Sequence, residues 1–271
     1  MKIGIISDIH VDVRYQENDR IEDALIDVIN KKGLDYLIVA GDISNDYELT
    51  LSTIDNIENK TNIRCLFVPG NHDLWNIKHK DIIDTTQIYR KYLEHESCLC
   101  RGVYKLNDEY VVIGDIGWYD YSYRDFKYSC EKYLIDCYLE KQWQDKKYIN
   151  WKVSDCEKTR YFYDKLKEEM ENFKDKKIIF VTHMVTHRGF LVNTSNNEKW
   201  KYFNGYLGSD LYKDLFNSNV KYVIMGHVHY RRNIEEEGIQ YICRCLGYRN
   251  QWRKGRKAKE EIEETIKVIE V

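Results

Sequence analysis

The chain has 271 residues, 43% of them hydrophobic and 32% charged, so it can bury a sizeable core as a single α/β domain over residues 1–271. Its net charge of −3 excludes a strong overall field for nucleic acid and argues against a polynucleotide partner. No run of 18 apolar residues occurs, and the short apolar start reaches Asp8 within seven residues. We therefore predict a cytoplasmic protein with no membrane partner.

Strand and helix patterns alternate in the first half of the chain. Apolar runs predict strands at residues 2–7, 35–40 and 63–68, and the stretches between them predict helices at residues 17–32 and 48–60. This order predicts parallel strands with right-handed crossovers. A helix at about residues 82–96 and a hairpin through residues 103–106 and 110–113 are expected next.

The segment 118–151 is rich in aromatic residues, with 11 of the 37 in the chain. We interpret it as a mostly helical cap that is inserted into the domain. Trp118, Tyr119, Tyr121 and Tyr123 follow a predicted strand end and could line a pocket or stack on a nucleobase. The alternative is that these rings only pack the cap against the rest of the molecule. Six acidic and six basic residues in the segment argue against a polynucleotide groove.

The second half continues the alternation. We expect a helix at residues 154–173, a strand at 177–182, a short helix at 211–217 and a strand at 222–225. The patterns of residues 239–245 and 265–271 are typical of antiparallel strands. The basic run between them, residues 249–259, is interpreted as a solvated hairpin loop, with a nucleic-acid contact as the alternative.

Five short polar motifs each follow a predicted strand. They are Asp8-Ile9-His10, Gly41-Asp42, Gly70-Asn71-His72-Asp73, Thr182-His183 and Gly226-His227-Val228-His229. The carboxyl ends of parallel strands meet at one crevice, so these motifs should meet in space. In an extended segment, Asp8 and His10 would point to the same side. Carboxylate, amide and imidazole ligands suit Mn, Fe or Zn better than Ca.

The order of the five motifs resembles the signature of the calcineurin-like metallophosphoesterases. The resemblance implies a four-layer α-β-β-α sandwich of two mixed sheets flanked by helices, in place of the open parallel sheet that the pattern alone suggests. It also implies two divalent or trivalent transition-metal ions, with Asp8, His10 and His229 at the first and Asn71, His183 and His227 at the second. Asp42 would bridge them, and His72 would lie beside them as a catalytic residue.

The family then implies hydrolysis of a phosphate mono- or diester by a metal-bridging hydroxide, with a small-molecule or nucleotide substrate. His72 would stabilise the phosphate or protonate the leaving oxygen. The alternative function is a catalytically silent scaffold that keeps the fold. The complete ligand set together with His72 favours the enzyme.

Two positions depart from the pattern of the related protein phosphatases. Asn45 stands where those relatives have an aspartate that orients the acid histidine, and Asp73 stands where they have glutamate. These differences argue against a phosphoprotein phosphatase. Asn45 could still hydrogen-bond His72, and Asp73 or Asp46 could supply the missing carboxylate.

Overall fold

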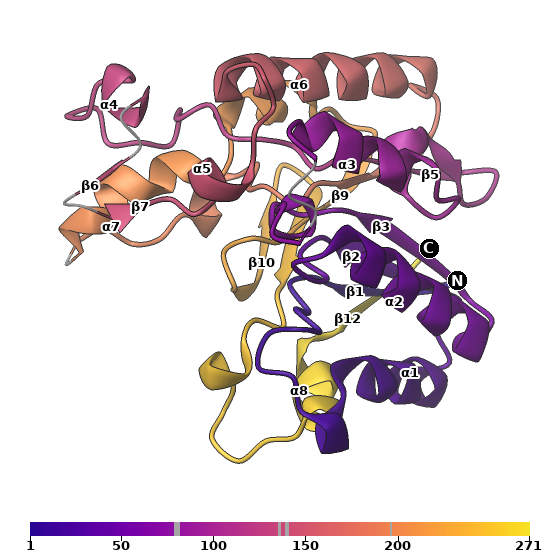
Figure 1. The fold of residues 1–271 in the computed structure, drawn as a ribbon. Helices are drawn as coiled ribbons and strands as arrows, with labels where there is room; N and C mark the ends of the chain where they lie inside the picture. Colours follow the sequence, from indigo (N-terminus) through magenta and orange to yellow (C-terminus); the bar gives the residue numbers. More distant parts are fainter. Residues whose placement is uncertain (79–81, 135–136, 139–140, 196) are drawn as a thin grey trace.

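The computed structural model of the chain describes residues 1–78, 82–134, 137–138, 141–195 and 197–271. Within these residues, two mixed β-sheets form the centre of the molecule (Figure 1). The smaller sheet has the order β12-β1-β2-β3 and the larger sheet has the order β10-β11-β9-β8-β5-β4. The larger sheet has an antiparallel strand at each edge, whereas the smaller sheet has one at the β12 edge only, and the other pairs of neighbouring strands are parallel.

The parallel strands are short apolar runs that are buried almost throughout. In the smaller sheet these are β1 (Lys2–Ile6), β2 (Tyr36–Ala40) and β3 (Arg64–Val68), and β12 (Lys267–Glu270) pairs antiparallel with β1. In the larger sheet they are β5 (Tyr110–Gly114), β8 (Lys177–Val181), β9 (Val220–Met225) and β11 (Ile239–Arg244), with β4 (Tyr104–Lys105) and β10 (Arg231–Glu236) at the edges. Burial on both faces explains why these strands show no polar alternation.

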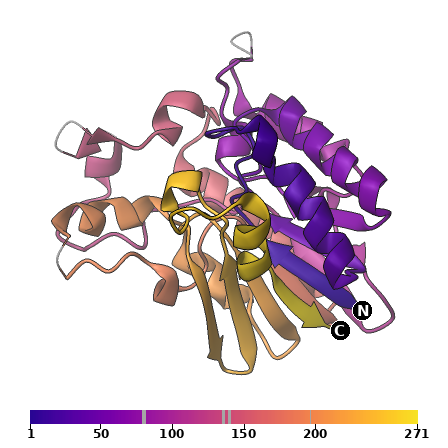
Figure 2. The same cartoon turned by 90° about the horizontal axis from the view of Figure 1, so that it is seen from below.

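Helices cover the outer faces of the two sheets (Figures 1 and 2). The group beside the smaller sheet is α1 (Ile21–Lys32), α2 (Tyr47–Thr61), α3 (Thr85–Leu93) and α8 (Ala258–Thr265). The long helix α6 (Asp155–Asn172) packs on β5 of the larger sheet and starts at a capping box formed by Ser154 and Glu157. These layers confirm the sandwich of two mixed sheets flanked by helices. None of the helices in the described residues is both long and apolar enough to cross a bilayer.

The predicted hairpin near the C-terminus is wrong. The strands β11 and β12 lie in different sheets, and the basic run between them contains a 3-10 turn, Arg249–Gln251, followed by α8. The helix forms because Ala258, Ile262 and Thr265 share a buried face. Arg249 is not solvated either, since its guanidinium pairs with Asp19 at 2.7 Å.

The aromatic segment is less helical than predicted. Its described residues contain only two four-residue helices, α4 (Glu131–Leu134) and α5 (Asp145–Tyr148), and the small hairpin β6 (Cys137–Tyr138) and β7 (Lys141–Gln142). Ring stacking fixes its shape instead, because Tyr133 stacks between Tyr121 and Tyr202, at centroid distances of 4.5 and 4.4 Å. We call residues 118–151 the cap segment. It packs with α7 (Glu198–Phe203) to one side of the sandwich (Figure 1).

The packing of the cap segment gives a test of its contribution to stability. Trp118 is fully buried, stacks on Tyr119 and donates to Asp155 at 2.7 Å, whereas Phe126 is 84% exposed. We expect Trp118→Ala to lower the free energy of unfolding by about 3–5 kcal/mol, and Phe126→Ala to change it by less than about 0.5 kcal/mol. Urea unfolding measures both, and equally small changes would contradict a packed cap.

Candidate metal centre

The seven side chains proposed as ligands from the sequence lie together at the carboxyl ends of the strands. The ligand atoms of Asp8, His10 and His229 lie within 4.8 Å of one another, and so do those of Asp42, His183 and His227. Asn71 joins the second group, because its Oδ1 lies 3.0 Å from His183 Nε2 and 3.0 Å from His227 Nδ1.

Asp42 lies between the two groups. Its Oδ2 is 3.8 Å from His10 Nε2, and its Oδ1 is 3.3 Å from His183 Nε2. His72 is the eighth polar side chain of the cluster, with its Nε2 3.9 Å from Asp42 Oδ2. A carboxylate in this position can contact two cations, one in each group.

The backbone at these residues is left-handed rather than extended. Positive φ angles occur at five of the seven proposed ligands: Asp8 (52°), His10 (41°), Asp42 (55°), His227 (71°) and His229 (53°). The expectation that Asp8 and His10 converge through strand alternation is therefore wrong. The chain turns sharply at each of them instead. Asp and His tolerate this conformation better than most residues, yet each instance still costs roughly 1 kcal/mol or more.

Two glycines allow the loops to approach closely. Gly41 has a φ of 84°, and a Cβ placed on it would collide with the ring of His183. A Cβ on Gly226 would lie 2.6 Å from Asp8 Oδ2 and 2.8 Å from the carbonyl oxygen of Ala40. Any side chain at either position would push a proposed ligand out of place.

Hydrogen bonds outside the cluster fix which nitrogen of two histidines faces inward. His183 Nδ1 donates to the carbonyl oxygen of Ala40 at 2.8 Å. His229 Nδ1 donates to Gln251 Oε1 at 2.7 Å. In the neutral imidazole, each Nε2 then presents a lone pair to the cluster. Such outer partners commonly set the tautomer of a metal-binding histidine.

The charges of the cluster are also set by its burial. Desolvation lowers the pKa of His10 well below its ordinary value and that of His227 to about 3, so both rings are neutral at pH 7. Burial disfavours the charged form of His183 as well, but Asp42 outweighs it and raises the pKa of His183 to about 10. A cation bound at His183 would take the place of that proton.

The arrangement fits positive ions between these groups. Asn71 Nδ2 donates to Asp145, so Asn71 Oδ1 is an acceptor, and it faces His183 Nε2, whose proton a bound cation would replace. His229 Nε2 presents its lone pair to His10 Nε2 at 3.2 Å, and His10 Nδ1 is buried without a hydrogen-bond partner among the described residues. Acceptors that point at acceptors repel one another unless a proton or a metal ion lies between them. Nitrogen and oxygen donors in this mixture suit transition-metal ions.

Asn45 orients His72, and Asp12 is the carboxylate that in turn holds Asn45. His72 Nδ1 donates to Asn45 Oδ1 at 2.7 Å, and Asn45 Nδ2 donates to Asp12 Oδ2 at 2.9 Å. The expectation that Asp73 or Asp46 fills this role is wrong. Asp73 accepts from the backbone of Ile43, Ser44 and Gly70, and Asp46 caps α2. His72 Nε2 is left facing Asp42 and the hydroxyl of Tyr248.

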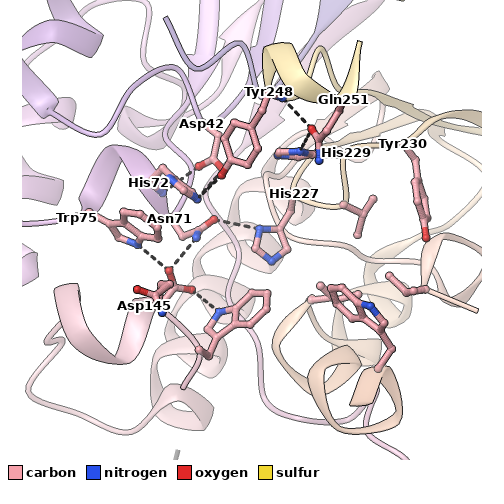
Figure 3. A pocket seen from close by; sticks show the side chains of 16 residues that line it. Asp42, Asn71, His72, Trp75, Asp145, His227, His229, Tyr230, Tyr248 and Gln251 are labelled. Atoms are coloured by element: carbon pink, nitrogen blue, oxygen red, sulfur yellow. Dashed lines mark hydrogen bonds and ion pairs between the residues drawn. The ribbon is translucent and has the colours of Figure 1, made fainter. Parts of the chain in front are cut away.

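Asp145 reaches the cluster from the cap segment. It is 1% exposed and accepts three hydrogen bonds, from Asn71 Nδ2 at 2.8 Å, Trp75 Nε1 at 2.7 Å and Trp143 Nε1 at 2.8 Å (Figure 3). Burial raises the pKa of Asp145, although these donors oppose the shift. Because the carboxylate binds the amide nitrogen of Asn71, the amide oxygen must point to His183 and His227.

A cavity of about 430 Å³ opens directly beside the cluster (Figure 3). Asp42, Asn71, His72, His227 and His229 form one wall. The aromatic rings in the lining belong to Trp75, Trp143, Trp200, Tyr230 and Tyr248. Of the two roles considered for Trp118, Tyr119, Tyr121 and Tyr123, packing of the cap segment is the one observed, because all four rings are buried and none lines this cavity.

Several of these residues carry little signal in the sequence. Asp12 continues the spacing of Asp8 and His10, and Trp75 closely follows His72, so both could be suspected from their position. Tyr248 and Gln251 lie in or beside the run interpreted as a solvated loop. Asp145 is one of six acidic residues in the cap segment, and only the fold distinguishes it from the others.

Comparisons with known proteins agree with this arrangement. The family model of calcineurin-like phosphoesterases matches residues 1–231. A comparison with curated proteins found no significant match by sequence. Among solved structures, a phosphopantetheinyl hydrolase of Mycobacterium tuberculosis superposes with a TM-score of 0.72 at 16% identity, covering 99% of this chain and 95% of that one.

Two further structures share the fold at lower similarity. A dimetal phosphatase from Danio rerio has a TM-score of 0.53 at 14% identity, over 90% of this chain and 86% of that one. A protein of Thermus thermophilus has a TM-score of 0.53 at 12% identity, over 98% of this chain and 97% of that one. At these identities the likeness concerns the fold, whereas the family match extends through the last motif as far as Arg231. The chain therefore belongs to the calcineurin-like phosphoesterases and is a metal-dependent phosphoesterase.

Proposed function

We propose that the chain hydrolyses a small phosphate mono- or diester at a centre of two metal ions. The carrying observation is the position of Asp42 between two groups of donors, one with Asp8, His10 and His229 and the other with Asn71, His183 and His227. Two such groups with one shared carboxylate support a pair of Mn, Fe or Zn ions. When bound, the ions neutralise the phosphate and supply an activated water.

The remaining polar groups support roles in handling the substrate. His72 is positioned by Asn45, and it lines the adjacent cavity with its Nε2 3.4 Å from the hydroxyl of Tyr248. From that position a protonated His72 can donate to the leaving oxygen. The complete set of donors, together with His72, favours an active enzyme over a silent scaffold.

A screen of phosphate monoesters and diesters with added Mn²⁺ tests the proposal. The panel includes a phosphopantetheinyl ester, because the structure with a TM-score of 0.72 is a phosphopantetheinyl hydrolase. Metal-dependent turnover of at least one ester is the expected result. No turnover of any ester with Mn²⁺, Fe²⁺ or Zn²⁺ would contradict the proposal.

The number of bound ions is the first quantity to measure. We expect about two transition-metal ions per chain by elemental analysis, consistent with the two donor groups. His229→Ala should lower this to about one, since it removes a donor from one group only. A chelator-treated protein that contains no metal and still hydrolyses bis-p-nitrophenyl phosphate at the full rate would refute the metal-dependent mechanism.

The proposed role of His72 predicts a dependence on the leaving group. We expect His72→Ala to lower kcat/KM for an alkyl phosphate by about 10²–10⁴, because an alkoxide needs a proton as it leaves. The loss on p-nitrophenyl phosphate should be much smaller, since nitrophenolate leaves without one. Equal losses on the two substrates would exclude the role of His72 as the acid.

The position of Asp145 predicts an effect on metal affinity. Asp145 Oδ1 accepts from Asn71 and Trp75, and its Oδ2 accepts from Trp143, so Asp145→Ala removes the acceptor of all three donors. We expect the affinity for one of the two ions to fall by about 10–100-fold, because Asn71 loses its anchor. Isothermal titration calorimetry of the metal-free protein with Mn²⁺ measures this affinity without any substrate.

A matched control is Asp155→Ala. Asp155 also accepts from an indole, Trp118 Nε1 at 2.7 Å, but it contacts the cap segment and not the cluster. Metal affinity should be unchanged in this variant. Equal losses in both variants would show that Asp145 acts only through the stability of the cap segment.

A further inference from the structure

The cavity beside the metal centre has few charged side chains in its lining. Among the described residues, no lysine or arginine lines it. Beyond the cluster, the wall is formed mainly by aromatic and aliphatic side chains, among them Val192, Trp200 and Leu207, and its uncharged polar side chains are Gln144 and Gln251. The two carboxylates in the lining, Asp42 and Asp145, add only negative charge. A charged group on a ligand would therefore lose its hydration here without gaining a partner.

The tryptophans nearest the cluster are held rigidly. Trp143 donates to Asp145 and lies flat on Tyr206, with ring centroids 5.3 Å apart and an angle of 13°. Trp75 donates to the same carboxylate and stacks on His72 at 3.7 Å. Two indoles fixed in this way present preformed apolar surfaces on either side of Asp145, and a planar group can stack on them at little entropic cost.

The lysines of this region lie elsewhere. Lys141, Lys147 and Lys199 are exposed and line a separate groove that shares Trp143 and Trp200 with the cavity. None of the three lines the cavity itself. The separation argues that the cavity is adapted to an uncharged group and not to a second phosphate.

We infer that this cavity binds the alcohol part of the substrate, and that the substrate is a phosphoester of an uncharged, largely apolar alcohol with a ring or similar planar group. The inference rests on the proposed function, because the cluster must hold the phosphate. The ring removes apolar surface from water against Trp200 and the indole of Trp143. The only anionic part of such a substrate is the phosphate at the metal centre.

A matched pair of substrates tests the inference on the full chain with Mn²⁺. The pair is 2-naphthyl phosphate and 4-carboxyphenyl phosphate, whose leaving phenols have similar acidity but differ in charge. We expect kcat/KM to be about tenfold or more higher for the naphthyl ester, which corresponds to about 1.4 kcal/mol. Equal kcat/KM values for the two esters, or a higher value for the carboxyphenyl ester, would overturn the inference while leaving the proposed function intact. No metal-dependent hydrolysis of either ester would overturn the inference, and the proposed function would fail with it only if no ester of the wider panel were hydrolysed.

Variants at Trp200 test whether the preference for the naphthyl ester comes from the cavity. Trp200 is on α7 and is not bonded to Asp145, so its substitution leaves the anchor of Asn71 in place. We expect Trp200→Leu to lower kcat/KM for the naphthyl ester by about threefold to tenfold, and Trp200→Lys to favour the carboxyphenyl ester. Phe126→Ala is the control, since Phe126 is exposed and lies outside the cavity lining.

The folding of each variant is measured separately from its preference between the two esters. Thermal unfolding and the content of bound Mn²⁺ are compared for each variant, so a loss of structure is distinguished from a loss of the aromatic wall. A folded, metal-loaded Trp200→Lys protein that keeps the original ratio between the two esters would contradict the assignment of the cavity.

Discussion

Asp42 carries the negative charge on which both donor groups depend. Burial alone would raise its pKa, but attraction to His183, His72 and His10 holds the pKa well below its usual range. The carboxylate therefore stays ionised although it is 1% exposed. Its Oδ1 also accepts from the backbone N–H of His72 at 2.9 Å, so the charge fixes the loop that carries the proposed acid. Neutralising Asp42 would leave several imidazoles facing one another without a shared partner.

The fold stores strain in order to hold this arrangement. Five proposed ligands have left-handed backbone, and the loops can approach only where glycine removes a side chain. Buried parallel strands on both sides of the cluster provide the stability that offsets this cost. The cap segment adds to this stability, since Asp145 holds Asn71 and two tryptophans at once. The same contacts that orient a proposed ligand therefore also shape the cavity beside the cluster.

Sequence patterns predict the centre of the fold well and its periphery less well. The strands from β1 to β3 and the helices between them are continuous apolar runs and amphipathic stretches, so periodicity alone locates them. The two-sheet sandwich could come only from the family resemblance, because local patterns do not say which strands pair. Residues 118–151 lack long helical periodicity, and contacts with α7 far along the chain determine their shape.

The same distinction holds for the site. The seven proposed ligands could be listed from short motifs, since each follows a strand end. Their supporting residues, Gln251 and Asp145, depend on contacts across the fold that no motif records.

The central claim is best tested by anomalous scattering from a crystal grown with Mn²⁺. The account predicts two peaks, one on each side of Asp42, with Asp8 and His10 at one and Asn71 and His183 at the other. A single peak, or peaks away from Asp42, would contradict it.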